Sequence, residues 1–383
     1  MFRTDTKKLY EEVTRGYNQL KSAKNSEERM ALANYIGNLY IAISSVQDSD
    51  VFIKEKTIFG SHKNYQKFVK KLDIYEVKML ENLVSQQDFH REYLRDIIMG
   101  VEDNFSRLKE EEMSKTTIIS KEECYAIFHD FMKSINQDNM FDKFYKEGRI
   151  YSSKVDEKNG SLGNTEYNPI SGETNIFIRN FKYDVHSMFT LAHEFGHVYD
   201  LSRFNESVEN FNKYFYQSFY GEVFSRLFER LFVQYLIKNN ILLNESKDML
   251  FEMELINHGY ALGSYILSLL DSQYLLSGSY QYFSKDKIFD LVQDKFIDTN
   301  YIKEFIKGST YFDVMEDFRY AYGDIVSMFL KVQIDNYGFD NDLIDEFFEI
   351  RSGLFDSDFI DRNNFNANRY KVLHRKESKM TKK

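Results

Sequence analysis

DVHSMFTLAHEFGHVYD, residues 184–200, is an apolar segment with helical periodicity that contains an HExxH motif. His193 and His197 are four residues apart, so a helix places both imidazoles on one face, one turn apart, where they can bind one zinc ion. Glu194 lies about a third of a turn away, which suits a base that takes a proton from the attacking water. Asp184 precedes the apolar run and is predicted to cap this helix.

A zinc site in a hydrolase usually has three protein ligands and one open position, so a further His, Asp or Glu is needed. Arg203 stands where the histidine-extended form of the motif has its third histidine, and a downstream glutamate is therefore favoured. Glu222 lies in an apolar, helical run, where a carboxylate is costly unless it is paired or bound to metal. Its alternative partner is Arg226, four residues on. Glu229, two turns on, could accept a hydrogen bond from a ligand histidine.

Outward from this helix, the chain divides into three predicted parts. Residues 1–115 have helical periodicity and form an N-terminal region, and residues 116–360 form the main domain, starting with a helix that Ser120 caps. Residues 146–182 carry two short β-like runs and several glycines, which predicts a small sheet or hairpin. Residues 361–383 are rich in Lys and Arg and poor in apolar residues, which predicts a flexible tail.

Composition favours a soluble, mainly α protein that is long enough to bury a large core. Of the 383 residues only one is Pro, so long helices can run uninterrupted, and 35 Phe and 28 Tyr must fill much of the core. The net charge of -10 argues against nucleic-acid binding, and no apolar run is long enough to span a membrane. A single cysteine, Cys124, and the absence of a signal-peptide core at the N-terminus predict a cytoplasmic protein.

The motifs together resemble those of the oligoendopeptidase F and thimet oligopeptidase family. TLAHEFGH, residues 190–197, is followed by GEVFSRLFE, residues 221–229. The E-x-x-S-x-x-x-E pattern of that family is met by Glu222, Ser225 and Glu229, and the first of these corresponds to its zinc ligand. GRIYSSKVDEKNG and TNIFIRNF resemble its substrate-side strands.

The resemblance implies a mainly helical zincin-type peptidase fold with a substrate channel, one zinc ion per chain and cleavage of internal bonds in short unstructured peptides. FRYAYG resembles the family's Tyr-Ala-x-Gly segment, so Tyr320 is expected to stabilise the oxyanion and Tyr322 is a candidate for substrate binding. His258, in NHGYALGSY, is a further candidate, because zinc peptidases of this kind commonly use a Tyr or His to stabilise the oxyanion. We also expect the backbone between Ile176 and Ile178 to form an edge strand that pairs with the peptide.

Three departures from the family pattern bear on substrate handling. The chain is markedly shorter than usual for the family, and the deficit lies in the N-terminal region, residues 1–115, which is expected to form a reduced roof over the channel. Asp200 replaces a frequent third histidine that is not a ligand, and Thr310 stands where bacterial members carry a substrate-contacting histidine. Two alternatives to a general oligopeptidase therefore stay open. One is a peptidase for a single dedicated peptide or a larger protein, and the other is a peptide-binding protein without activity. The sequence predicts no oligomeric state.

Overall fold

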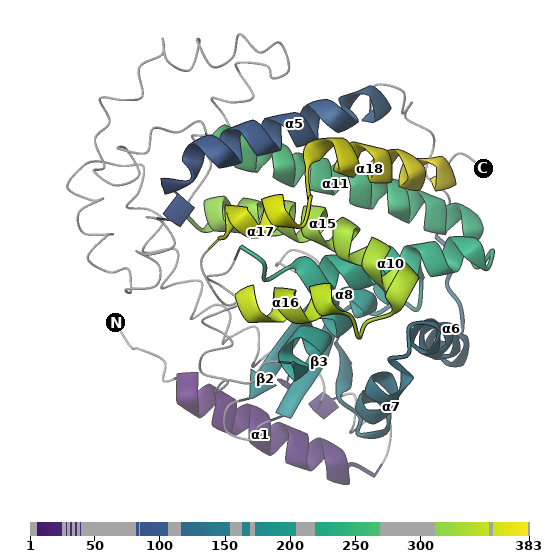
Figure 1. The fold of residues 1–383 in the computed structure, drawn as a ribbon. Helices are drawn as coiled ribbons and strands as arrows, with labels where there is room; N and C mark the ends of the chain where they lie inside the picture. The colour runs from purple at the N-terminus through teal and green to yellow at the C-terminus, as the bar shows by residue number, and fades with distance from the viewer. Residues whose placement is uncertain are drawn as a thin grey trace, which may run out of the picture.

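The computed structural model describes residues 6–24, 28, 31–32, 35–36, 39, 82–83, 85–105, 116–153, 163–168, 173–203, 219–268, 311–351 and 355–381. The described part is mainly helical, as the sequence predicts, and carries one small sheet (Figure 1). Its elements are, in chain order, α1 (Thr6–Ser22), α5 (Gln87–Phe105), α6 (Lys121–Ser134), α7 (Asp138–Lys146), β1 (Ile150–Ser153), β2 (Gly163–Asn168), β3 (Glu173–Arg179), α8 (Val185–Ser202), α10 (Val223–Lys238), α11 (Leu243–Ser268), α15 (Tyr311–Tyr337), α16 (Asp342–Ile350), α17 (Ser357–Arg362) and α18 (Ala367–Thr381).

Both predicted helix caps are present. Asp184 accepts a hydrogen bond from the Ser187 N–H at 2.7 Å, and α8 begins at the next residue. The Ser120 hydroxyl accepts one from the Glu123 N–H at 3.1 Å at the start of α6. Each cap satisfies a backbone donor that the first helical turn cannot pair, and so fixes where the helix begins.

The sheet has the strand order β1-β3-β2. Its central strand, β3, pairs in parallel with β1 and antiparallel with β2, so that Ile176 lies opposite both Ile150 and Thr165. The sequence predicts β1 and β3 as two β-like runs but not β2, because GNTEYN consists mostly of residues that are rare in strands. The small sheet is confirmed, with one strand more than predicted.

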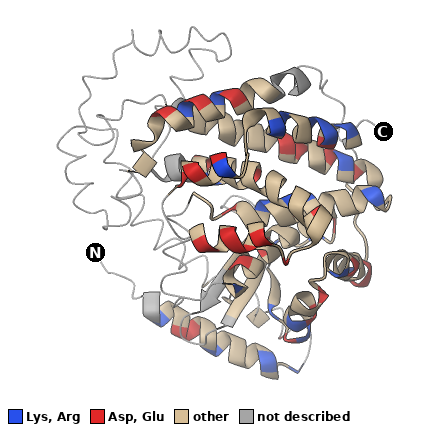
Figure 2. Cartoon of the chain, viewed as in Figure 1, with Lys and Arg blue, Asp and Glu red and all other residues tan. Residues whose placement is uncertain are grey.

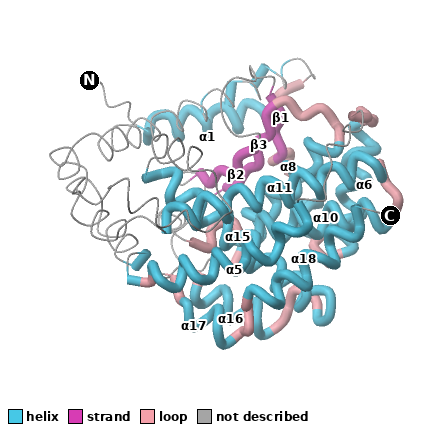
Figure 3. The backbone as a smooth tube through the Cα atoms, turned by 90° about the horizontal axis from the view of Figure 1, so that it is seen from above, coloured by secondary structure: helices cyan, strands magenta, loops and turns pink. Residues whose placement is uncertain are grey.

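The sheet forms a layer between α1 and α8 (Figures 1 and 3). Successive side chains of a strand point to opposite faces. Ile176 and Ile178 accordingly belong to the main core, whereas Phe177 packs with α1 and Tyr151 in a smaller apolar cluster. In that cluster the rings of Tyr17 and Tyr151 have centroids 4.7 Å apart. The sheet therefore holds α1 on one face and the central helix on the other.

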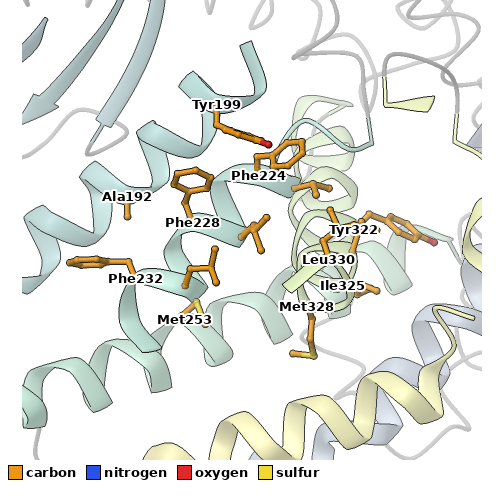
Figure 4. Packing of buried hydrophobic residues seen from close by; sticks show 14 of the residues in the cluster. Ala192, Tyr199, Phe224, Phe228, Phe232, Met253, Tyr322, Ile325, Met328 and Leu330 are labelled. Carbon is orange, nitrogen blue, oxygen red and sulfur yellow. The ribbon is translucent and has the colours of Figure 1, made fainter. Parts of the chain in front are cut away.

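The main core lies where α10 packs against α8, α11 and α15. Figure 4 shows side chains from these helices pointing toward one another, among them Phe224, Phe228 and Phe232 along α10. Aromatic rings supply much of the volume, as the composition predicts; Phe128, for example, has its ring centroid 5.6 Å from that of Phe232 and 5.4 Å from that of Phe195. This packing fixes α8 and α10, which carry the candidate site.

The prediction of a flexible tail over residues 361–383 is wrong for the residues that the structure describes. Helix α18 packs on α5 and α11 (Figure 1). Its Tyr370 and His374 side chains are buried. Tyr370, His374, Glu377 and Ser378 recur three or four residues apart, so they share one buried face of the helix, whereas Arg375, Lys376 and Lys379 are exposed. Charge content alone therefore gave the wrong answer.

The described helices of the N-terminal region, residues 1–115, lie at two places. Helix α1 packs on the sheet, and α5 packs on α11 and α18 as part of the main core. Charged side chains of both signs occur on the helices in Figure 2, with only acidic ones on α16. Among the described residues, no helix is long and apolar enough to cross a membrane.

Candidate metal centre

The two histidines of the HExxH motif lie on one face of α8, as predicted. The Nε2 atoms of His193 and His197 are 3.1 Å apart, and the ring planes are nearly perpendicular at 82°. Helix α8 approaches α10 closely at this level because residue 196 is glycine. A Cβ atom at Gly196 would lie 2.4 Å from the Phe224 carbonyl oxygen, which real side chains do not tolerate.

Glu222 completes a triangle with the two histidines. Its Oε2 atom lies 3.5 Å from Nε2 of His193 and 3.5 Å from Nε2 of His197. Glu222 stands at the N-cap position, so it precedes α10 and does not lie within a helical run as the sequence suggested. The Ser225 hydroxyl donates to the same Oε2 at 2.6 Å, which fixes the direction of the buried carboxylate.

The triangle has the dimensions of a zinc site. Ligand atoms about 2.0–2.1 Å from a tetrahedral zinc ion are separated from one another by about 3.3–3.4 Å. The three observed separations are 3.1, 3.5 and 3.5 Å. Two imidazoles and one carboxylate are also the ligand types found in hydrolytic zinc sites. Within the described part of the chain, no other group of three His, Cys, Asp or Glu residues lies close enough to bind one ion.

Glu229 holds the outer nitrogen of His193, in the contact that the sequence predicts. The Nδ1 atom of His193 donates to Oε1 of Glu229 at 2.7 Å, so Nε2 is the nitrogen that faces Glu222 and His197. Arg226 donates from Nη1 to the other oxygen, Oε2, of Glu229 at 2.7 Å. Arg226 therefore pairs with Glu229. The alternative suggested by the sequence, an ion pair between Arg226 and Glu222, is not the contact that Arg226 makes.

Glu194 is buried beside the triangle and contacts β2. The Thr165 hydroxyl donates to Oε2 of Glu194 at 2.6 Å and lies 3.0 Å from the Glu194 carbonyl oxygen. Gly163 on the same strand makes room for this carboxylate, because a Cβ atom there would lie 2.4 Å from Oε1 of Glu194. Neither Thr165 nor Gly163 was identified from the sequence, since nothing in a polar, glycine-containing stretch indicates that it lies against the motif.

Burial is the largest influence on the pKa of Glu194, and it raises that pKa to about 7. The positive charge of His193 and the hydrogen bond from Thr165 oppose this rise, whereas the carboxylates of Glu222 and Glu229 add to it. A carboxylate with a pKa near neutrality can both accept and return a proton at ordinary pH. These properties suit the role predicted for Glu194.

The pKa values of the three residues of the triangle are shifted in different directions: that of His193 is raised, and those of His197 and Glu222 are lowered. Burial lowers the pKa of His193, but the charge and hydrogen bond of Glu229 outweigh burial and raise that pKa to about 9. Burial lowers the pKa of His197 to about 3. Burial acts to raise the pKa of Glu222, yet the two histidines and Arg319 outweigh it and lower that pKa to about 2. Glu222 is therefore an anion that is ready to bind a cation.

Helix α15 contributes three residues next to the triangle. Nε of Arg319 lies 3.9 Å from Oε1 of Glu222, whereas the two histidines contact the other carboxylate oxygen, Oε2. A Cβ atom at Gly323 would lie 2.8 Å from Cβ of Glu222, so glycine allows α15 to approach. Tyr320 lies beside them, half-buried, with its ring over the guanidinium of Arg226 at 4.6 Å. Arg319 was not singled out from the sequence.

The structure contradicts the roles predicted for Ile176 and Ile178. Strand β3 is the central strand, so both of its edges are already paired and it cannot accept a peptide. Both side chains are buried in the main core. The sequence prediction failed because strand order in a sheet depends on long-range pairing, which a run of apolar residues does not reveal.

Tyr322 and His258 lie away from the triangle as well. Tyr322 is fully buried and its hydroxyl is hydrogen-bonded to Nδ1 of His90 at 2.7 Å, within an aromatic cluster of the core. His258 lines a small polar cavity with Arg230 and Asp324, and none of the residues of the triangle lines that cavity. The burial of Tyr322 therefore contradicts its predicted contact with substrate, whereas the contact predicted for His258 stays a prediction.

Of the two residues that depart from the family pattern, only Asp200 lies in the described part of the chain. It is buried and paired with Arg351, and the Arg351 side chain also donates to the Asp200 carbonyl oxygen at 3.1 Å. Asp200 therefore anchors the end of α8 rather than the metal triangle. Thr310 lies outside the described residues.

No protein-family model matches the sequence, and no curated protein matches it significantly. Among solved structures, the chain is similar to PZ peptidase A with inhibitor 2, with a TM-score of 0.50 and 12% identity, over 98% of this chain and 75% of that one. A candidate oligoendopeptidase F from Bacillus anthracis str. Ames gives a TM-score of 0.48 at 12% identity over 97% and 74% of the two chains. A candidate peptidase from Chlamydophila abortus gives 0.44 at 12% identity over 93% and 63%. The first likeness shows that this chain shares the fold of PZ peptidase A.

Proposed function

We propose that this chain is a zinc metalloendopeptidase of the oligoendopeptidase type, which hydrolyses internal bonds of short unstructured peptides. His193, His197 and Glu222 hold the metal, one ion per chain, and Glu194 is the catalytic base. The observation that carries the proposal is the triangle of Nε2, Nε2 and Oε2 atoms with the spacing of zinc ligands. The fold shared with PZ peptidase A supports a peptidase.

Bound zinc would supply Lewis acidity that activates a water molecule and polarises the scissile carbonyl. Glu194 takes a proton from the attacking water and delivers it to the leaving amine nitrogen. Its pKa of about 7 makes both transfers accessible near neutral pH. Thr165 holds the carboxylate in place during both transfers, because its hydroxyl donates to Oε2.

Tyr320 is the proposed donor to the oxyanion. Burial, together with the negative charge of Glu222, raises the pKa of Tyr320 well above its ordinary value, so its hydroxyl keeps its proton. A protonated hydroxyl can donate a hydrogen bond to the developing negative charge. Stacking on Tyr260, with ring centroids 4.5 Å apart, limits the movement of the Tyr320 ring.

The peptide is proposed to lie along β2 in place of β3. β1 and β2 are the two outer strands of the described sheet, and of these β2 carries Thr165 directly against the base. Main-chain hydrogen bonds to such a strand ignore the side chains of the peptide, which gives broad sequence tolerance. We also propose a cytoplasmic location, supported by the single cysteine, and no binding to nucleic acid, supported by the net charge of -10.

The proposal is tested by incubating the zinc-loaded protein with a mixed peptide library and identifying products by mass spectrometry. We expect internal cleavage by the parent protein and none by Glu194→Gln, which should still contain about one zinc per chain because Glu194 is not a ligand. His193→Ala should lose the zinc. Zinc retention by His193→Ala would refute the site, whereas a parent protein that binds zinc and cleaves nothing would favour a peptide-binding protein.

A further inference from the structure

Arg226 lies on the second turn of α10 and is buried against the proposed centre. Only 5% of its surface is exposed. Its Nη1 atom donates to Oε2 of Glu229 at 2.7 Å, and its guanidinium carbon lies 4.6 Å from the centroid of the Tyr320 ring. One side chain therefore touches both the residue that holds a ligand histidine and the proposed oxyanion donor.

The contact with Glu229 fixes the geometry of His193. The two oxygens of Glu229 are shared between these partners, with Oε1 accepting from Nδ1 of His193 and Oε2 accepting from Arg226. The permanent positive charge of Arg226 keeps the carboxylate an acceptor on both sides. His193 is thereby held as the tautomer with its proton on Nδ1, which leaves the Nε2 lone pair for the metal.

The contact with Tyr320 is of a different kind. The guanidinium carbon lies over the Tyr320 ring, 4.6 Å from its centroid, and 5.8 Å from the centroid of the Tyr260 ring, which stacks on Tyr320 with an interplanar angle of 13°. A flat cation on the ring restricts how Tyr320 can tilt. Arg226 lies on α10 and Tyr320 on α15. Their contact therefore also positions Tyr320 relative to α10, which carries Glu229.

We propose that Arg226 is a positioning residue that couples metal binding to the placement of Tyr320. It acts through Glu229 on the ligand His193 and through its guanidinium plane on Tyr320. The inference rests on the proposed function, and it assigns to Arg226 a role beyond that of an ordinary helix ion pair. A pair between residues three apart would need only a positive charge, whereas the cation–π contact with Tyr320 favours the flat, weakly hydrated guanidinium over a lysine ammonium.

Substitution of Arg226 by lysine distinguishes the contact with Glu229 from the contact with Tyr320. Arg226→Lys keeps a positive charge that can reach Glu229 and removes the plane that lies on Tyr320. Arg226→Met removes both contacts and keeps a side chain of similar length. The variants are compared by competition of zinc with a chelator, by the visible spectrum of the Co²⁺-substituted protein, and by kcat and KM on a peptide that the parent cleaves.

We expect Arg226→Met to weaken zinc binding about 10- to 100-fold, the usual effect of losing support for a ligand. Arg226→Lys should keep zinc affinity and the Co²⁺ spectrum near those of the parent. It should lower kcat about 10- to 100-fold with little change in KM, because the oxyanion donor is misplaced. In a Tyr320→Phe background, Arg226→Lys should have almost no further effect on kcat.

Arg230→Lys is the matched control, since Arg230 is a buried arginine one turn further along α10 whose pairs are Asp324 and Glu377. It should leave zinc affinity unchanged. Unchanged zinc affinity in Arg226→Met would overturn the proposal. So would an equal loss of kcat from Arg226→Lys in the parent and Tyr320→Phe backgrounds. If the parent binds zinc but cleaves no peptide, the proposed function fails, and zinc affinity and the Co²⁺ spectrum alone decide the role of Arg226.

Discussion

The hydroxyl of Thr165, on the outer strand β2, lies 2.6 Å from the carboxylate oxygen Oε2 of Glu194 on the central helix. This hydrogen bond connects the sheet to the proposed base. Gly163, two residues earlier on β2, permits the close approach, because a Cβ atom would collide with Oε1 of Glu194. The strand therefore contributes to both the position and the proton affinity of the base.

Replacement of Thr165 by Val should impair catalysis without removing zinc. The hydrogen bond lowers the pKa of Glu194, so its loss should raise that pKa further above the ordinary value of a glutamate. A base works only in its ionised form, which exists above its pKa. The acidic limb of the dependence of kcat/KM on pH should therefore move to higher pH, by about one unit for a hydrogen bond to a charged group.

Thr190→Val is the matched control for this change. Thr190 lies one turn before Glu194 on α8, and its hydroxyl donates to the His186 carbonyl oxygen at 3.0 Å. This variant should keep the pH profile of the parent. An unshifted acidic limb in Thr165→Val, at equal zinc content, would mean that the strand does not tune Glu194.

Two carboxylates of the centre should differ in how much they contribute to metal affinity. Glu222→Gln removes a ligand and should weaken zinc binding by far more than the change at Glu229, which holds His193 from behind. Glu229→Gln should cost about 10- to 100-fold. Titration with a competing chelator measures both. Glu254→Gln, a buried glutamate that accepts from the Ser378 hydroxyl at 3.0 Å, should bind zinc like the parent.

The order of these effects is diagnostic. If Glu222→Gln bound zinc as tightly as the control, Glu222 would not be a ligand, and the triangle would have to be a set of buried ion pairs. If Glu229→Gln were the weaker binder, the assignment of ligand and supporting residue would be reversed. Equal zinc affinities in both variants and the control would exclude the centre altogether.

The central part of the site could be predicted because it is local in sequence. Spacing along one helix fixes His193, Glu194 and His197, and the helical periodicity around them is strong. Glu222 and Glu229 were reached through the run that follows, although the helix starts only after Glu222. His193, Glu194 and His197 needed only short-range geometry, whereas Glu222 and Glu229 also needed the resemblance to the family's E-x-x-S-x-x-x-E pattern.

The predictions from the sequence failed where tertiary contacts determine the position of a residue. Whether Ile176 lies on an edge or in the centre depends on β2, which has no clear strand pattern in the sequence. Tyr320 and Tyr322 are two residues apart in one helix, and only the packing shows that the first faces Arg226 and the second faces His90 in the core. The burial of α18 likewise depends on the surface of α5 and α11.

The approach of α8 to α10 should be sensitive to one methyl group. Gly196→Ala would place Cβ 2.4 Å from the carbonyl oxygen of Phe224, a backbone atom that cannot move alone. Overpacking of this kind costs roughly 1–3 kcal/mol and should also separate the histidines from Glu222. We expect lower stability in urea unfolding and weaker zinc binding.

Gly259→Ala on α11 is the matched control, because a Cβ atom at this position would have no neighbouring atom within 4 Å. This variant should instead stabilise the protein by about 1 kcal/mol. Equal behaviour of the two variants would contradict the close helix contact.

Buried His90 should make the protein less stable in acid. Burial lowers the pKa of His90 to about 3, whereas the unfolded chain has an ordinary value near 6.5. The neutral form is therefore favoured by folding, so its contribution is complete above about pH 6.5 and is lost as the pH falls toward 3. At about pH 4.5 the loss amounts to about 2–3 kcal/mol, since each unit of pKa difference corresponds to about 1.4 kcal/mol.

His90→Asn keeps a polar group near Tyr322 but does not titrate. Urea unfolding of both proteins at about pH 7 and about pH 4.5 should show a difference between the two pH values that is smaller in the variant by about this amount, with loss of metal in acid affecting both alike. The same pH dependence in parent and variant would mean that His90 is solvated or already charged in the folded protein.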